Sequence, residues 1–284
     1  MAQPDPAETI AFQGAPGAYS DLCCRQEFPA MATLPRETFA DVFAAVRDSR
    51  ARLAMIPIEN SLAGRVADIH HYLPDSGLHI IAEHFQRVEH NLLAPKGATL
   101  DGLTHVHSHV HALGQCRKLI AEQHLKAEVH ADTAGAAADV AAKGDPTRAA
   151  IASTLAADIY GLEILKSNIE DAEHNTTRFV VMAAEPIRPE PEADAVMTSF
   201  VFQVRNVPAA LYKVLGGFAS NSVNMLRLES YMIDASFTST LFYAEIEGHP
   251  EQANVKLAFE ELEFFSRSVS ILGVYPENPF RSEN

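Results

Sequence analysis

The chain has 284 residues, a length that suits two domains, and hydrophobic residues make up 47% of it. Its formal net charge of −15 makes nucleic acid and acidic membranes poor partners, and an anionic substrate would need a local positive site. No run of about 18 apolar residues predicts a membrane-spanning helix, and the first residues do not resemble a signal peptide. Cys23, Cys24 and Cys116 make a poor disulfide framework, so a cytoplasmic protein with reduced thiols is expected.

Strand-like and helix-like patterns alternate through the first two thirds of the chain, which predicts an α/β domain with largely parallel sheets. The segment 52–60 is expected to be a buried strand that is stopped by Pro57. Strands are predicted at 9–14, 52–60, 103–107, 126–131, 148–153 and 177–183, and helices at 39–46, 109–123, 133–143 and 153–160.

The composition changes at residues 184–196, where prolines and acids predict a linker. In the segment that follows the linker, the residue pattern predicts the order β-α-β-β-α-β, which is that of the split βαβ fold. Its first helix is expected to start near Pro208. Fold alone does not assign a function to this unit.

The segment 105–116 places four histidines at every second position before a cysteine. In a single strand they would share one face, and nitrogen and sulfur ligands suit zinc or copper. Ser108, however, is a good N-cap for a helix that begins at 109 or 110, which would end the strand geometry. Without a nearby carboxylate, the two remaining histidines make a poor metal set, and no metal is expected. The alternative is an anion pocket at Ser108, with Gln115 two turns further on. The run comprises His105, His107, His109, His111 and Cys116.

Two other polar segments follow predicted strands. QGAPGAYSD, at 13–21, is either a tight turn or a turn whose amides and Ser20 hydroxyl face an anion. Glu59, Asn60 and Ser61 end a buried strand, where ligands bind in open α/β sheets. The alternative is that Asn60 or Ser61 caps a helix that begins near Leu62.

Arg178 stands at the start of a buried strand, behind the acidic segment 168–176. A buried guanidinium is costly unless an anion pairs with it, and its planar fork matches a carboxylate. The partner is either a substrate carboxylate or a structural acid such as Asp171 or Glu173.

Five stretches, in chain order, resemble the sequence blocks of the prephenate dehydratase family. Thr-Arg-Phe, in the last stretch, is the most specific of them. The unit at 197–276 resembles the ACT regulatory domain. The stretches are IAFQGAPGAYSD, MIPIENSLAGRV, HSHVHALGQC, AAIASTLAADIYGLEIL and IEDAEHNTTRF.

The resemblance implies decarboxylating dehydration of prephenate to phenylpyruvate, in phenylalanine biosynthesis, without a cofactor. It implies a bilobal catalytic domain similar to periplasmic binding proteins, followed by a ferredoxin-like α+β (βαββαβ) ACT domain. The implied boundaries are 8–184 for the catalytic domain (lobes of about 8–86 with 178–184, and 87–177), 185–196 for a linker and 197–276 for the ACT domain.

Carried over by position, Thr177 matches the key threonine of the family. A threonine hydroxyl is a weak acid, so hydrogen-bond donation to the leaving hydroxyl is expected rather than full proton transfer. Val110 and His111 stand where the family has proline and glutamine. The candidate catalytic residues are Thr177, Asn60, Ser108, Gln115 and Glu59; the candidate substrate-binding residues are Arg178, Phe179, Ser20, Ser61 and His109.

By the same resemblance, L-phenylalanine is expected as an allosteric effector between paired ACT domains of a homodimer or tetramer. Ala209 replaces a family glycine, and Tyr231-Met232 replaces Arg-Pro. An ACT unit used only for dimerisation is the alternative. The candidate effector-binding residues are Ala210, Leu211, Asn224, Leu226, Glu229 and Ser230.

Other functions stay open on the sequence alone. An arogenate dehydratase, or an enzyme that accepts both substrates, would use nearly the same site. A bilobal fold with an ACT unit is also compatible with a non-catalytic amino-acid sensor, although the intact Thr-Arg-Phe favours an enzyme. A metal-dependent hydrolase that uses the histidines is the weakest alternative.

Overall fold

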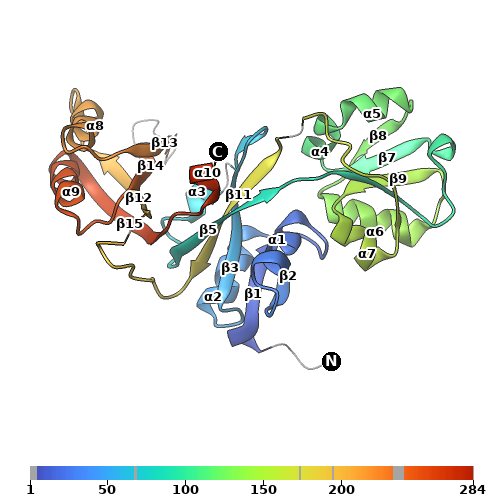
Figure 1. Cartoon of the computed structure of the whole chain (residues 1–284), viewed down its shortest axis with the longest axis horizontal. Helices are drawn as coiled ribbons and strands as arrows, with labels where there is room; N and C mark the ends of the chain where they lie inside the picture. The colour runs from blue at the N-terminus through green and yellow to red at the C-terminus, as the bar shows by residue number, and fades with distance from the viewer. Residues whose placement is uncertain (1–4, 67–68, 173, 194, 233–239, 284) are drawn as a thin grey trace. The chain divides into compact units, whose positions relative to one another are not determined.

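The computed structural model divides the chain into two compact units (Figure 1). One comprises residues up to 66 together with 84–179, and the other comprises 67–83 together with everything from 180 onward. The described residues are 5–66, 69–172, 174–193, 195–232 and 240–283. Within them, no helix is long and apolar enough to cross a bilayer.

The first lobe is built on a six-stranded sheet. β1 pairs in parallel with both β2 and β3, and the connecting helices are α1 (Tyr19–Glu27) and α2 (Phe39–Arg47). α2 packs on the sheet with Val42, Phe43 and Val46 buried. Across the sheet the strands are β2 (Ala32–Arg36), β1 (Thr9–Gln13), β3 (Leu53–Asn60), β11 (Thr176–Ala183) and β5 (His79–Arg87), with β4 (Gly64–Arg65) paired to β3 and the short η1 (Pro6–Glu8) before β1.

β3 continues through Pro57 to Asn60, so the predicted stop at the proline is wrong. A proline is tolerated in a strand wherever its missing N–H is not needed for a ladder bond. The helix expected at Leu62 is also absent, because Asn60 pairs with Gly64 in a β3–β4 hairpin. Gly64 has a φ of 80°, the left-handed conformation that a tight reversal of the chain requires.

The second lobe holds a mixed five-stranded sheet, which corrects the expectation of largely parallel pairing. β7 pairs in parallel with β8 and β9, whereas β6 pairs antiparallel with β9 and β10. The order is β10 (Glu163–Lys166), β6 (Asn91–Ala94), β9 (Arg148–Ala152), β7 (His105–Ser108) and β8 (Lys126–Val129), with η2 (Leu100–Gly102) between β6 and β7.

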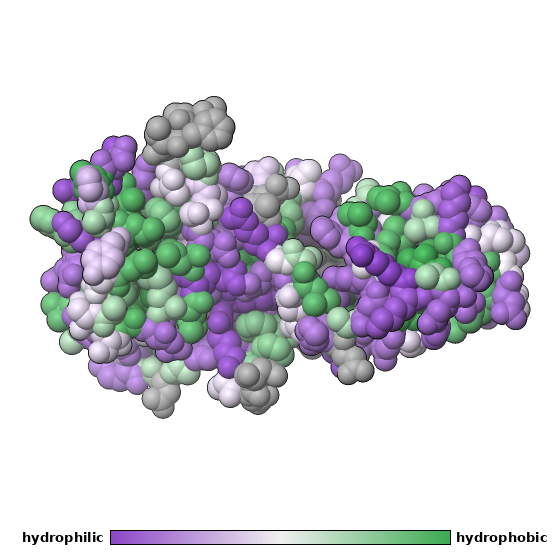
Figure 2. Space-filling view, turned by 90° about the horizontal axis from the view of Figure 1, so that it is seen from above, coloured by the Kyte–Doolittle hydropathy of each residue, from purple (hydrophilic) through white to green (hydrophobic). Residues whose placement is uncertain are grey.

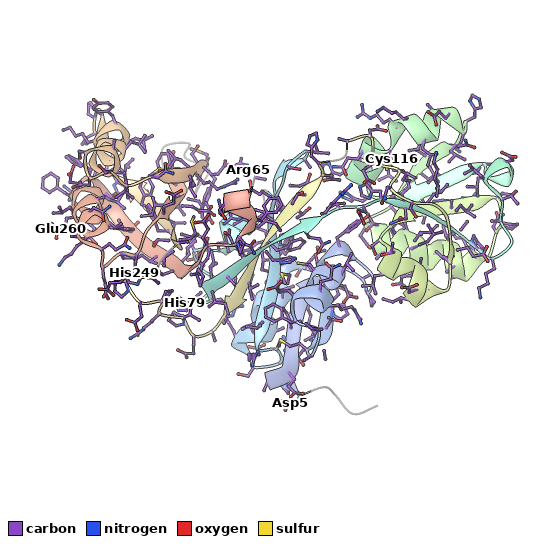
Figure 3. The ribbon with its side chains drawn as sticks, in the orientation of Figure 1. Asp5, Arg65, His79, Cys116, His249 and Glu260 are labelled. Carbon is purple, nitrogen blue, oxygen red and sulfur yellow. The ribbon has the colours of Figure 1, made fainter. Side chains whose placement is uncertain are left out.

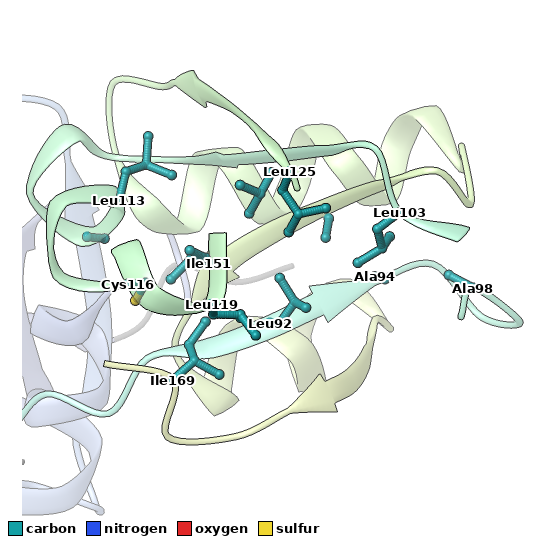
Figure 4. Close-up of a cluster of buried hydrophobic side chains, with 13 residues drawn as sticks. Leu92, Ala94, Ala98, Leu103, Leu113, Cys116, Leu119, Leu125, Ile151 and Ile169 are labelled. Carbon is teal, nitrogen blue, oxygen red and sulfur yellow. The ribbon is translucent and has the colours of Figure 1, made fainter. Parts of the chain in front are cut away.

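Helices cover both faces of this sheet. Because successive strand residues point to opposite faces, Leu92 and Ile151 join one apolar cluster while Leu93 and Ala150 join another. Figure 4 shows the first cluster, which includes Cys116. The covering helices are α4 (Val110–Gln115) and α5 (Arg117–Glu122) on that side, and α6 (Thr133–Lys143) and α7 (Thr154–Tyr160) on the other.

The helix predicted at 109–123 is divided in two at Cys116 (Figure 3), whose φ of −124° is not helical. The reason lies in a distant loop: the Asp171 carboxylate accepts the main-chain N–H groups of Arg117 and Lys118, at 3.0 and 3.1 Å, and so starts α5. The expected N-cap was also wrong by one residue. His109 caps α4, and Ser108 is the last residue of β7.

The C-terminal unit has the predicted order β-α-β-β-α-β, and its sheet runs β13-β14-β12-β15 with antiparallel pairs. Phe200, Phe202, Phe218 and Phe259 lie at the centre of its core. The elements are β12 (Val196–Val204), α8 (Ala210–Ser220), β13 (Met225–Met232), β14 (Thr240–Glu247), α9 (Ala253–Phe265) and β15 (Ser266–Pro276), joined in this unit by α3 (Ile69–Tyr72) and α10 (Phe280–Glu283).

Candidate active site

The neighbouring strands β3 and β11 bring Asn60 against Thr177. The Asn60 side-chain amide donates to Thr177 Oγ1 at 3.0 Å and to Asn175 Oδ1 at 2.8 Å. Its own Oδ1 accepts the main-chain N–H groups of Leu62 and Ala63, at 3.0 and 2.8 Å, which determines which way the amide faces. Because Thr177 Oγ1 accepts the Asn60 bond, the single hydroxyl proton of Thr177 is available to a second acceptor.

Arg178 lies on the opposite face of β11, since successive strand residues alternate. Its side chain is only 2% exposed, and its guanidinium lies 3.4 Å from Glu59 Oε1. The Phe85 ring is also close, with its centroid 6.0 Å from Arg178 Cζ. Arg178 therefore has an acidic partner in this structure, Glu59 rather than Asp171. Glu173 lies outside the described residues.

Asn175 continues the network into the second lobe. It is fully buried, and its amide donates to Gln115 Oε1 at 2.9 Å. The same Gln115 oxygen lies 2.8 Å from His90 Nε2, and His90 Nδ1 lies 2.8 Å from the Tyr19 hydroxyl. Sequence reasoning missed three of these residues. Asn175 could have been found, because it stands two positions before Thr177, directly ahead of β11, but nothing local marks His90 or Tyr19.

Burial sets the protonation state at the far end of this network. It lowers the pKa of His90, against the smaller opposing effects of Gln115 and Glu170, and it raises the pKa of Tyr19. Both groups are therefore neutral near pH 7. Glu170 also accepts the main-chain N–H of His90 at 2.9 Å, which holds the chain just before β6.

A cavity of about 470 Å³ adjoins this network through Gln115. Two of its lining residues, His111 and Arg117, can carry positive charge. Apolar side chains from both lobes, including Leu62 and Val110, also line the cavity. The lining comprises Leu62, Ala63, Val110, His111, Gly114, Gln115, Arg117, Asp171 and Ala172.

Several predicted site residues do not line this cavity. Ser108 is fully buried, and its hydroxyl donates to the Ile151 carbonyl at 2.6 Å, so its proton is already used. Phe179 is 1% exposed and packs in the core. Ser61 donates to the His174 carbonyl at 2.8 Å and accepts the Thr176 N–H at 3.0 Å, which ties the loop before β11 to the hairpin. His109 caps α4.

The glycine-rich turn at 13–21 joins the two lobes. The Gly17 carbonyl accepts the Ser153 hydroxyl at 2.5 Å, and the Gly17 N–H donates to Asp21 at 2.8 Å. That carboxylate takes the place an anion would need, while Ser20 is buried in the first turn of α1. Gly17 itself is required, because its φ is 87° and a Cβ there would lie 2.9 Å from the Ala156 Cα.

The histidine run does not form one strip. His105 and His107 keep strand geometry, but the expectation that no carboxylate lies near them is wrong: Glu128 of β8 is 3.6 and 3.4 Å away. Arg148 lies 3.0 Å from His107 Nε2, which must accept that bond because a guanidinium only donates. Among the described residues, no group of three or more His, Cys, Asp or Glu side chains is placed to hold a metal.

The predicted effector residues separate into two groups. Ala210 and Leu211 line a cavity of about 340 Å³ in the C-terminal unit, together with Arg205 and Tyr212. The other four lie on or beside β13, an edge strand of the sheet, and none of them lines that cavity. They are Asn224, Leu226, Glu229 and Ser230.

Comparisons with known proteins identify the family of the chain. Residues 10–187 match the family model of prephenate dehydratase. This chain belongs to the prephenate dehydratase family. It is 54% identical, over 96% of its length and 97% of the relative, to a bifunctional N-acyl-homoserine lactone acylase/prephenate dehydratase of Komagataeibacter europaeus. It is 36% identical, over 94% of its length and 72% of the relative, to arogenate dehydratase/prephenate dehydratase 2 of Arabidopsis thaliana.

Among solved structures, a prephenate dehydratase from Arthrobacter aurescens in complex with L-Phe is 28% identical, with a TM-score of 0.85. The match covers 95% of this chain and 90% of that one. GqqA, a quorum-quenching acylase, is 53% identical with a TM-score of 0.91, over 96% of this chain and 99% of that one. Both matches extend well beyond the family model, into the C-terminal unit.

Proposed function

We propose that the protein converts prephenate to phenylpyruvate, with loss of carbon dioxide and water. The observation that carries the proposal is the Asn60–Thr177 hydrogen bond, in a chain that belongs to the prephenate dehydratase family. The bond leaves one hydroxyl proton on Thr177 for the substrate. The ring of prephenate gains aromatic stabilisation when both groups leave.

The residues suggest how the reaction proceeds. Thr177 donates a hydrogen bond to the ring hydroxyl of the substrate as its C–O bond breaks. The C–C bond between the ring and its carboxylate breaks, and carbon dioxide leaves. The electron pair of that bond enters the ring and completes the aromatic system, while the departing hydroxide takes its proton from water. Asn60 strengthens the Thr177 donor by bonding to its oxygen. Donation that grows as charge develops on the leaving oxygen lowers the barrier rather than only binding substrate.

A cation is needed for the carboxylates of prephenate in a chain with a net charge of −15. Arg178 is buried against Glu59, so we propose Arg117 for this role. Arg117 is exposed and lines the cavity beside Gln115, and a guanidinium matches the geometry of a carboxylate.

The test is incubation of the purified protein with prephenate at neutral pH, followed by detection of phenylpyruvate. A parallel assay with arogenate, scored by phenylalanine formation, gives the ratio of kcat/KM for the two substrates. Phenylpyruvate formation above the spontaneous rate is expected, and it should persist in chelator. A rate equal to the uncatalysed one would refute the proposal and would favour the alternative function, a non-catalytic amino-acid sensor.

We also propose that the C-terminal unit is an ACT domain that binds L-phenylalanine, and that the lobes form the bilobal arrangement of periplasmic binding proteins. The βαββαβ order and the complex of the Arthrobacter aurescens relative with L-Phe support the first part. Because none of the candidate residues on or beside β13 lines the Ala210 cavity, we propose that a second copy contributes them, in a dimer or tetramer. Apolar residues gather on this unit's surface (Figure 2). Leu226 and Leu228 of edge strand β13 are among its exposed large apolar residues. Saturating phenylalanine should change activity and oligomer size; no change in either would contradict this.

A second candidate function rests on the 54% identical relative, which is named as both an N-acyl-homoserine lactone acylase and a prephenate dehydratase. If this chain shares the first activity, it should release homoserine lactone and a fatty acid from N-acyl-homoserine lactones. Mass spectrometry of the products tests this. The Thr177→Val variant in the same assay shows whether the two activities use one site.

A further inference from the structure

The donor and acceptor of each hydrogen bond in the Asn60 network follow from the orientation of the Asn60 amide. Asn60 Oδ1 is held by two main-chain N–H groups, so its amide nitrogen must face Asn175 Oδ1. Asn175 then turns its own amide nitrogen toward Gln115, and Gln115 must present its oxygen there. Reversing either amide would set two donors against each other.

The same reasoning extends to the imidazole. Gln115 Oε1 can only accept, so His90 Nε2, 2.8 Å away, must carry a proton. His90 is neutral, so Nδ1 is unprotonated and accepts from the Tyr19 hydroxyl at 2.8 Å. The Glu89 carbonyl, 2.9 Å from that hydroxyl, is the other acceptor within its reach. His90 is 2% exposed and does not line the cavity.

We infer that His90 is a positioning residue: its Nε2–H, together with Asn175, holds the Gln115 carbonyl inward and thereby turns the two Gln115 amide N–H donors toward the cavity. Gln115 lines that cavity, and both bonds to its oxygen come from buried side chains. Two N–H donors on one nitrogen suit a carboxylate or another oxygen-rich group. The inference rests on the proposed function only in taking prephenate as the ligand that these donors meet.

Kinetics give the first test. His90→Leu removes the Nε2 donor, while Tyr19 retains the Glu89 carbonyl as an acceptor. The KM for prephenate should rise roughly tenfold, the loss expected for one hydrogen bond, with kcat changed much less. His90→Gln, which can offer an amide N–H, should recover most of the loss. Addition of His90→Leu to Gln115→Leu should raise KM no further, because His90 acts through Gln115. Additive losses, or an unchanged KM in His90→Leu, would overturn the inference.

A spectroscopic test does not depend on turnover. In the full-length protein labelled with ¹⁵N-histidine, the His90 signals, assigned by their absence from His90→Gln, should show a proton on Nε2 and none on Nδ1. A proton on Nδ1 alone would overturn the inference, whatever the enzyme does. If the wild-type protein does not consume prephenate but the Nε2–H tautomer is found, the proposed substrate fails while the role of His90 in orienting Gln115 stands.

Discussion

Asn60 and Thr177 are 117 residues apart in the sequence, yet the Asn60 amide donates to the Thr177 hydroxyl oxygen across a distance of 3.0 Å. One residue along each strand, Glu59 and Arg178 form an ion pair at 3.4 Å. Side-chain alternation in β3 and β11 thus places the Asn60–Thr177 pair on one face and the Glu59–Arg178 pair on the other.

Thr177→Val removes the hydroxyl donor but keeps the shape of the side chain. We expect kcat on prephenate to fall roughly 10²–10³-fold, the usual effect of losing one donor to a developing negative charge, with little change in KM. The adjacent Thr176→Val is the matched control, because Thr176 points to the other face of β11. Near-wild-type kcat in Thr177→Val would remove this threonine from the mechanism.

Arg178→Met tests our proposal that the Glu59–Arg178 ion pair stabilises the fold. Taking one partner from a largely buried ion pair should cost about 3 kcal/mol of unfolding free energy, the lower end of the usual range, because Glu59 is 24% exposed. Urea unfolding measures it. The double variant Arg178→Met/Glu59→Gln should recover much of the loss. If Arg178→Met instead raises KM without loss of stability, the guanidinium binds substrate.

Arg117→Gln removes the exposed cation of the cavity lining. The KM for prephenate should rise about tenfold, because a charge-assisted bond to a carboxylate is lost, and kcat should change little. Lys118→Gln removes the same charge one residue along and lies outside the lining, so it serves as the control. Equal effects of both substitutions would indicate long-range attraction rather than contact.

Ala209→Gly should stabilise the C-terminal unit. Ala209 precedes α8 with a φ of 62°, a left-handed conformation that costs a residue with a Cβ about 1 kcal/mol and costs glycine little. The melting temperature should rise by a few degrees. Ala219→Gly, at an exposed position inside α8, should lower stability by about 0.5–1 kcal/mol. A fall in melting temperature for Ala209→Gly would mean that the Ala209 methyl group makes a contact worth more than the strain.

The lowered pKa of His90 predicts how stability depends on pH. Below about pH 6.5, the unfolded chain takes up a proton at His90 that the folded chain resists, so the free energy of unfolding falls as the pH falls. Burial lowers the pKa of His107 and of His109 as well, so both add to the dependence of stability on pH. We expect the unfolding free energy, measured with urea on both sides of pH 6.5, to depend less steeply on pH in His90→Gln than in the wild type. The exposed His71→Gln is the control, and equal slopes in all three proteins would contradict the buried neutral imidazole.

The sequence by itself determined much of the local structure. Apolar periodicity placed α6 at 133–143, as found, and the βαββαβ order of the C-terminal unit. The ordered blocks that end in Thr-Arg-Phe also pointed to the family that the comparisons confirm. These features depend on neighbours within a few turns or strand residues, which a local pattern records.

Only the tertiary structure decided which side chains meet. Asp171 breaks the predicted helix at Cys116 from more than 50 residues away, and it thereby places Gln115 at the end of α4. Glu59 rather than Asp171 pairs with Arg178, and His90 enters the network although nothing near it in the sequence marks it. Such contacts follow from strand order and register, which bring distant residues within about 3 Å of one another. Local residue patterns carry no information on that pairing.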